Sequence, residues 1–257
     1  MTVTSDLGPQ ERIAAIEPDS LRAQEPVEIG AHRKYPLITD PRHKDVAEMF
    51  AVLRTRLLTA KAKSGITSVL VSSAQAQEGK SFVCVNLALS VSQLCRDRVL
   101  LVDGDLRRGG ITKLFGLSGS SGLADYLEAR DGFDGCVRET TSPGLWVTPA
   151  GNLGENSLPT VLEGPRWPEF LERAAREYAM VIVDSVPVCA PIADFELLLS
   201  GCDAALLVVK LRKTTREALN LTSQRLNGKL LGVVVNNTEV HSKSEKYYYA
   251  GKGRKNP

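Results

Sequence analysis

A glycine, a lysine and a serine stand in a row at Gly79, Lys80 and Ser81, directly after an apolar run and a short polar turn. Such a loop can wrap backbone N–H groups around phosphate oxygens, while the lysine reaches the terminal phosphates and the hydroxyl binds magnesium. A helix that starts at about residue 81 would add the positive end of its dipole to this anion site. The chemistry indicated is the binding of a nucleoside triphosphate.

The tripeptide by itself is weak evidence for a nucleotide site. Gly-Lys pairs recur at 228–229 and 251–252 without any phosphate-binding context. Ala74 also occupies the position of the first glycine in the standard loop pattern. The context strengthens the prediction, because a strand precedes the loop, a helix follows it, and two later strands end in acids.

Carboxylates follow two other apolar runs at the points where strands would end. Asp103 and Asp105 follow the run 99–102, and Asp184 follows the run 180–183. Ligands bind at the carboxyl ends of the strands in parallel sheets, so these acids should meet the phosphate loop. A single aspartate after a strand is usually only a turn or cap residue. Three strand ends that offer phosphate and metal ligands together favour a magnesium-nucleotide site.

The elements that must position these side chains follow from alternating apolar runs and helical patterns. Continuous Val, Leu and Ile runs separated by helices indicate an α/β fold, with a mostly parallel sheet covered by helices on both faces. The expected strands are 66–71, 98–102, 145–149, 180–183, 204–209 and 230–235. The expected helices are 45–63, 80–95, 121–129, 165–178, 190–200 and 214–227.

Length and composition fit one globular unit. The chain has 257 residues, of which 43% are hydrophobic, enough for a buried core. Its net charge of +2 gives no whole-surface field that would attract nucleic acid. The five cysteines have no paired spacing, which indicates a reducing cytosol and no metal site. No apolar run reaches the ~18 to 20 residues of a membrane span, so none is expected.

The chain divides into three segments. Residues 1–44 hold five prolines among polar residues and show no period, so we expect a disordered leader. Residues 45–240 form the nucleotide-binding domain. Residues 241–257 form a flexible tail in which Tyr247, Tyr248 and Tyr249 lie among lysines without apolar neighbours. Such a cluster is either functional or part of a sticky, disordered tail.

Three segments together resemble the Walker A, A′ and B motifs of the bacterial tyrosine kinases. They are the phosphate loop, the Leu-Leu-Val-Asp-Gly-Asp-Leu-Arg sequence at 100–107 and the Val-Ile-Val-Asp-Ser-Val-Pro sequence at 181–187. This family comprises cytoplasmic autokinases of capsule and exopolysaccharide assembly. It is related to the septum-site and partition ATPases, the MinD/ParA branch of the P-loop NTPase fold. The likeness runs from about Asp45 to the C-terminus.

The resemblance implies ATP and Mg²⁺ as cofactors and a role for each site residue. Lys80 would contact the ATP phosphates, and Asp103 would ready a tyrosine hydroxyl for attack on the γ-phosphate, with Asp105 in support. The implied catalytic residues are therefore Lys80, Asp103 and Asp105. The implied magnesium ligands are Ser81, Asp105 and Asp184. The implied nucleotide-binding residues are Gln77, Glu78, Gly79, Lys80, Ser81, Phe82 and Asn236, the last one near the adenine.

The resemblance also implies partners and a location. Tyr247, Tyr248 and Tyr249 would accept phosphate in the active site of a neighbouring subunit, and each phosphate would add about −1.5 to −2 charge beside the lysines. A membrane polysaccharide co-polymerase would activate the cytoplasmic chain and hold it at the inner face of the plasma membrane. A cognate tyrosine phosphatase would reverse the modification.

Departures from the family pattern leave two alternatives open. Ala76 and Gln77 replace a common Pro-Gly pair, so a weakly catalytic, nucleotide-switched scaffold is one alternative. Ala51 interrupts a ring-assembly motif of which Glu48 and Arg54 remain, which puts a stable ring in question. A positioning ATPase of the partition or septum-site class is the second alternative, although it would carry a signature lysine near the start of the loop. All metal and phosphate side chains are retained, which favours an active kinase.

Overall fold

The computed structural model describes residues 25–29, 37–94, 98–154, 156–190, 193–226 and 228–237. A seven-stranded sheet in the order β3-β4-β2-β5-β1-β6-β7 forms its centre. Only the pairing of β3 with β4 is antiparallel. The strands are β1 (Ser68–Ser73), β2 (Val99–Asp103), β3 (Arg138–Glu139), β4 (Leu145–Thr148), β5 (Met180–Asp184), β6 (Ala204–Lys210) and β7 (Leu230–Asn236). The mostly parallel α/β sheet is confirmed, and β3 is the strand that the sequence did not predict.

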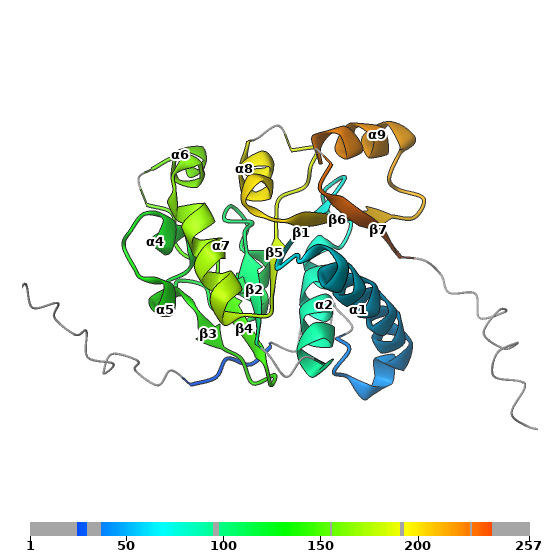
Figure 1. Ribbon diagram of the computed structural model, residues 1–257, viewed down its shortest axis with the longest axis horizontal. Helices are drawn as coiled ribbons and strands as arrows, with labels where there is room; N and C mark the ends of the chain where they lie inside the picture. Colours follow the sequence, from blue (N-terminus) through cyan, green and yellow to red (C-terminus); the bar gives the residue numbers. More distant parts are fainter. Residues whose placement is uncertain are drawn as a thin grey trace, which may run out of the picture.

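Helices cover both faces of the sheet (Figure 1). They are η1 (Pro41–His43), α1 (Lys44–Ser64), α2 (Lys80–Leu94), α3 (Gly110–Leu114), α4 (Leu123–Leu127), α5 (Phe133–Cys136), α6 (Leu158–Glu163), α7 (Arg166–Glu177), α8 (Asp194–Gly201) and α9 (Arg216–Arg225). The six expected helices are present. The short helices α3, α5 and α6 were not expected, because one turn or a little more does not display a helical period.

Alternate residues of the strands feed two separate cores. On β1, Leu70 packs into the core that contains Trp167 and Phe170 of α7 and Phe195 of α8. Its neighbour Val69 packs on the opposite face, with residues of α1 and α2. Successive side chains of a strand point to opposite faces, so a strand buried on both sides must be apolar throughout. This burial on both faces explains why each central strand contains a continuous run of apolar residues.

Part of the segment expected to be a disordered leader has ordered contacts. The backbone N–H of Val27 donates to the Glu139 carbonyl at 2.9 Å, and Thr141 donates back to the Val27 carbonyl at 3.0 Å. The N–H of Ile38, a buried residue, donates to Asn86 Oδ1 at 2.9 Å. The expectation is therefore wrong for 25–29 and 37–44, where Val27 pairs with backbone groups of the domain and Ile38 pairs with the side chain of Asn86. The rest of the leader lies outside the described residues.

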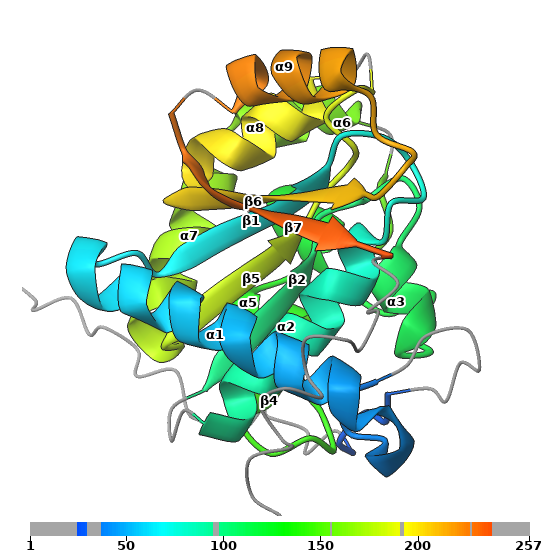
Figure 2. The ribbon, with the colours of Figure 1, turned by 90° about the vertical axis from the view of Figure 1, so that its right-hand side faces the viewer.

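Figure 2 shows β7 at the edge of the sheet, with α1 on the same side of the molecule.

Among the described residues, no helix combines the length and apolar character needed to cross a bilayer.

The carboxyl ends of β2 and β5 are held together with little space between them. Asp103 lies opposite Asp184 in the register of these strands. The N–H of Gly104 donates to the Asp184 carbonyl at 2.8 Å, and a Cβ built on Gly104 would lie 2.5 Å from that oxygen. Because the obstacle is backbone, any side chain at this position must push the two strand ends apart.

We therefore expect Gly104→Ala to lower the free energy of unfolding by about 1–3 kcal/mol, the usual cost of overpacking. Urea denaturation followed by circular dichroism measures this change. Gly232→Ala on β7 is the matched control, since its Cβ would lie 3.8 Å from Leu206 Cδ2 in ordinary contact. Equal stability of the two variants would contradict the close approach.

Candidate functional site

The phosphate loop, residues 74–79, joins β1 to the N-terminus of α2. Gln77 (φ 63°) and Gly79 (φ 95°) both have left-handed backbone conformations, which turn successive N–H groups toward one side. The first N–H groups of α2 have no acceptor within the helix, and the helix dipole is positive at this end. The sequence predicted an anion site here, and the strand-loop-helix arrangement has the backbone geometry that such a site needs.

Lys80 bridges two carboxylates, one that follows β2 and one at the end of β5. Its Nζ lies 3.1 Å from Asp105 Oδ2 and 3.3 Å from Asp184 Oδ1. The hydroxyl of Ser81 donates to Asp184 Oδ2 at 2.5 Å. The side chains of Asp105 and Asp184 are 3% and 0% exposed and that of Lys80 is 13% exposed, so the cluster is shielded from water. Four predicted site residues thus meet at one point.

Asp103 lies beside this cluster and is held by a different partner. Its Oδ2 accepts hydrogen bonds from the N–H and the hydroxyl of Thr112, both at 2.7 Å. Its Oδ1 is buried and has no hydrogen-bond partner among the described residues. The two acids of the Asp-Gly-Asp sequence therefore differ in environment: Asp105 pairs with Lys80, whereas Asp103 keeps an oxygen free to accept a proton.

Burial and charge act against each other at these groups. Burial alone would lower the pKa of Lys80, but Asp184 and Asp105 outweigh it and raise that pKa above its usual value. Burial raises the pKa of Asp184, although the charge of Lys80 and the Ser81 hydrogen bond oppose the change. Burial, followed by the charge of Asp184, raises the pKa of Asp103 to about 7. A carboxyl group with such a pKa suits proton acceptance near neutral pH.

The donor set fits a magnesium ion bound together with a triphosphate. Among the described residues, no group of three or more His, Cys, Asp or Glu side chains could hold a metal. Magnesium, however, is usually bound by one or two carboxylates, with phosphate oxygens and water as further ligands. Ser81, Asp105 and Asp184 would supply the protein ligands in this arrangement.

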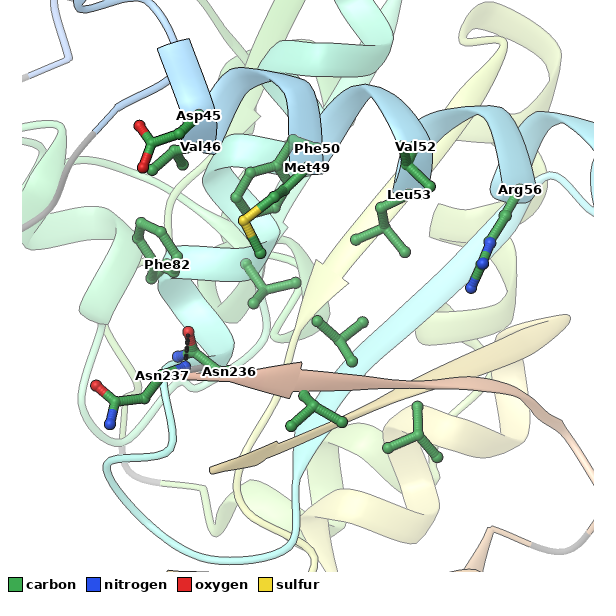
Figure 3. A pocket seen from close by; sticks show the side chains of 14 residues that line it. Asp45, Val46, Met49, Phe50, Val52, Leu53, Arg56, Phe82, Asn236 and Asn237 are labelled. Atoms are coloured by element: carbon green, nitrogen blue, oxygen red, sulfur yellow. Dashed lines mark hydrogen bonds between the residues drawn. The ribbon is translucent and has the colours of Figure 1, made fainter. Parts of the chain in front are cut away.

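Two of the predicted nucleotide-binding residues line a groove beside the phosphate loop. The groove, about 510 Å³ in volume, lies between α1 and β7 and contains Phe82 and Asn236 (Figure 3). Phe82 packs edge-on against Phe50 of α1, with ring centroids 5.7 Å apart. Asn236 Nδ2 donates to the Glu78 carbonyl at 2.9 Å, and a Cβ on Gly79 would lie 2.1 Å from this nitrogen. Asn236 thus contacts the phosphate loop itself.

Other predicted residues are placed away from the charged cluster or lie outside the described residues. Gln77 is exposed on the loop, whereas Glu78 is buried beneath it. The tyrosines at 247–249 fall outside the described range. Sequence reasoning gave no role to Thr112, which holds Asp103, or to Thr214, which contacts Glu78. Neither lies in one of the three motifs that carry the family resemblance, and a threonine beside a short helix or in a loop gives no signal of its own.

Comparison with known proteins gives close matches among the kinases. No family model matches the chain. The chain is 31% identical to the tyrosine-protein kinase YwqD of Bacillus subtilis over 219 residues, which cover 84% of the chain and 90% of the relative. It is 30% identical to the tyrosine-protein kinase etk of Escherichia coli over 74% of the chain, but spans only 26% of that longer relative.

Solved structures agree with the sequence comparison. The kinase domain of the Escherichia coli tyrosine kinase ETK matches with a TM-score of 0.69 and 30% identity, over 74% of each chain. A ParA family ATPase from Chlorobium tepidum matches with a TM-score of 0.53 and 22% identity, over 71% of this chain and 80% of that one. The second likeness shows the P-loop fold alone. Because the chain aligns with the Bacillus subtilis kinase over most of both lengths and shares the fold of the Escherichia coli kinase domain, it belongs to the bacterial tyrosine kinase family.

Proposed function

We propose that the chain is an ATP-dependent protein-tyrosine autokinase that modifies its own tyrosines at 247–249. The observation that carries this proposal is the convergence of Lys80 with Asp105 and Asp184, within 3.3 Å, at the N-terminus of the helix after the phosphate loop. Residues far apart in the sequence have no structural need to bury three charges together. A site that binds magnesium and phosphate does need them.

In this mechanism the chain mainly positions and neutralises charge. The loop N–H groups and Lys80 would hold the ATP phosphates, while Ser81, Asp105 and Asp184 would hold the metal. A bound magnesium ion would supply positive charge to the oxygens of the transferred phosphoryl group. Asp103 accepts the tyrosine proton at Oδ1, since Thr112 already occupies Oδ2. Because Asp103 is fully buried, a tyrosine reaches it only after the site rearranges.

A membrane partner is the proposed cause of that rearrangement. Two relatives carry names that refer to polysaccharide loci: a putative kinase in the cps region of Klebsiella pneumoniae and EpsB of Ralstonia solanacearum. By extension, the chain would regulate capsule or exopolysaccharide polymerisation and export. A co-polymerase would recruit it from the cytoplasm to the inner face of the plasma membrane, and a tyrosine phosphatase would oppose it.

Self-association is proposed to be weak, because the motif on α1 is incomplete and partly engaged within the chain. Arg54 Nη1 donates to the Ser90 carbonyl of α2 at 3.0 Å, so this guanidinium is directed at its own domain. Ala51 offers no charge at the interrupted position. Glu48 remains exposed, and no ion pair joins it to another described residue.

Light scattering of the purified chain at micromolar concentration should therefore give the mass of a monomer or another small assembly. Ala51→Arg restores a bidentate donor and should move the average mass upward, since arginine binds carboxylates through two N–H groups. Thr55→Arg, one turn further along the exposed side of α1, is the control and should leave the mass unchanged. A stable ring formed by the unmodified chain would disprove this proposal.

The kinase proposal is tested by incubating the purified chain with Mg-ATP, with and without the cytoplasmic segment of a candidate activator, and probing for phosphotyrosine. We expect Lys80→Met to reduce labelling by at least about 100-fold, because it removes a preorganised charge from the transferred phosphoryl group. Replacing all three tyrosines at 247–249 with phenylalanine should remove the label as well.

Lys63→Met is the matched control, because Lys63 is exposed in the last turn of α1, which leads into the start of β1, whereas the phosphate loop follows the other end of this strand. It should label as the wild type does. Phosphate release without tyrosine label would instead indicate a positioning ATPase. Nucleotide binding with neither label nor phosphate release would indicate a scaffold.

The scaffold alternative has one specific observation in its favour, the left-handed backbone of Gln77 (φ 63°). This conformation costs a residue with a side chain about 1–2 kcal/mol, and glycine avoids that cost. An altered loop that carries such strain is a physical reason for weak nucleotide binding.

Gln77→Gly should accordingly raise the free energy of unfolding by up to about 1 kcal/mol, after allowance for the entropy that glycine loses on folding. Gln75→Gly serves as the control, since the φ of Gln75 is not positive and the change should cost about 0.5–1 kcal/mol. Urea denaturation measures both variants. Destabilisation by Gln77→Gly would show that the loop is not strained at this residue.

A further inference from the structure

The phosphate loop is tied to a distant part of the chain by a buried carboxylate. Glu78 is 1% exposed, and its Oε2 accepts a hydrogen bond from the N–H of Gln75 at 2.8 Å. Its Oε1 accepts a hydrogen bond from the hydroxyl of Thr214. Glu78 therefore closes the loop on itself with one oxygen and joins it to the segment after β6 with the other.

Thr214 is itself fixed in place. It lies in residues 211–215, which we term the β6–α9 loop. Its hydroxyl accepts a hydrogen bond from the N–H of Lys210 at 3.0 Å. The next residue, Thr215, has a separate function, because its side chain caps α9 by accepting from the N–H of Ala218. Two adjacent threonines thus serve two different elements.

Two further contacts join the same regions. Lys213 Nζ donates to the Ala76 carbonyl at 2.9 Å. Asn236 Nδ2, at the end of β7, donates to the Glu78 carbonyl at 2.9 Å. Every one of these bonds runs from the C-terminal third of the chain to residues 76–78. Neither the strand before this short loop nor the helix after it needs so many side-chain hydrogen bonds to the loop in order to form.

The reason for these bonds lies in the loop's own backbone. A non-glycine residue in a left-handed conformation, such as Gln77, persists only where the surrounding structure determines it. The flanking residues Ala76 and Glu78 are the ones that receive the bonds. Glu78 has no ion-pair partner among the residues that the structure describes. Its buried carboxylate therefore depends on its hydrogen bonds, because burial without them is costly.

We propose that Thr214, acting through Glu78, is a positioning residue for ATP: it holds the phosphate loop in the conformation that binds the phosphates. The inference rests on the proposed function in that it takes ATP as the ligand. Thr214 contacts neither the charged cluster nor the predicted magnesium ligands, so its loss should weaken nucleotide binding and leave the chemical step intact.

The test measures the dissociation constant of a fluorescent ATP analogue in the presence of magnesium. Thr214→Val keeps the shape but removes the hydroxyl, and it should raise the dissociation constant about tenfold, the size expected for losing a hydrogen bond to a charged group. Thr214→Ser keeps the hydroxyl and should bind within about twofold of the wild type. In labelling assays, Thr214→Val should raise the KM for ATP and leave kcat unchanged.

Thr215→Val is the matched control for a purely structural effect. It removes the α9 cap and should lower the melting temperature, with the affinity for the analogue unchanged. Equal loss of affinity in Thr214→Val and Thr215→Val would overturn the inference, as would wild-type affinity in Thr214→Val.

A double-mutant cycle gives a second, independent measure. Glu78→Met keeps the approximate length of the side chain but removes both acceptor oxygens, and it should also raise the dissociation constant. Adding Thr214→Val to it should produce little further change, because Glu78→Met already removes the acceptor of the Thr214 hydroxyl. Fully additive effects would contradict the inference. If Thr214→Val does not fold, the affinity of Glu78→Met for the analogue is compared with that of Thr215→Val, and equal affinities would overturn the inference.

The outcomes separate this inference from the kinase proposal. A wild-type chain that binds no ATP analogue would overturn both. A wild-type chain that binds the analogue without phosphotyrosine label would overturn only the kinase proposal, since the affinity measurements do not depend on phosphoryl transfer.

Discussion

The ion cluster of Lys80 with Asp105 and Asp184 is the constraint on which the rest of the structure depends. Charges removed from water are costly unless they pair with good geometry and further hydrogen bonds. Here the lysine meets two carboxylates, and Ser81 adds a hydrogen bond to Asp184. The three elements that carry these residues must therefore end at one place. The same charges that are costly to bury are the ones that phosphate and magnesium require.

The sheet provides that meeting point through its register. Asp184 lies beside Asp103 on one side and beside Val71 of β1 on the other. A shift of one residue in either pair would turn every side chain of the strand to the opposite face. The separate cores on the two faces of the sheet resist such a shift, because β1, β2 and β5 are buried on both sides. The geometry of the site is thus fixed by packing far from the charges.

The features that could be predicted from the sequence are those that produce long apolar runs or several turns of a helical pattern. Six strands and six helices are visible as apolar runs or helical periods, and the strand-end acids follow from the parallel topology. Features that depend on a few specific hydrogen bonds were not predictable: the two backbone bonds of Val27, the bond of Ile38 to the Asn86 side chain, and the bonds of Thr112 to Asp103. The family resemblance implied different roles for the two acids of the Asp-Gly-Asp sequence, but their different partners, Thr112 and Lys80, are visible only in the fold. Short helices such as α3 show no period.

The phosphate loop connects the site to the edge of the molecule. Asn236 lines the groove between α1 and β7 and also donates to the carbonyl of Glu78 in the loop. Any molecule that occupied this groove would lie against a side chain that helps to hold the loop. Sites that share a residue in this way can influence each other's affinity, and the influence is reciprocal. The groove and the phosphate loop are therefore joined directly, through the side chain of Asn236 and the carbonyl of Glu78.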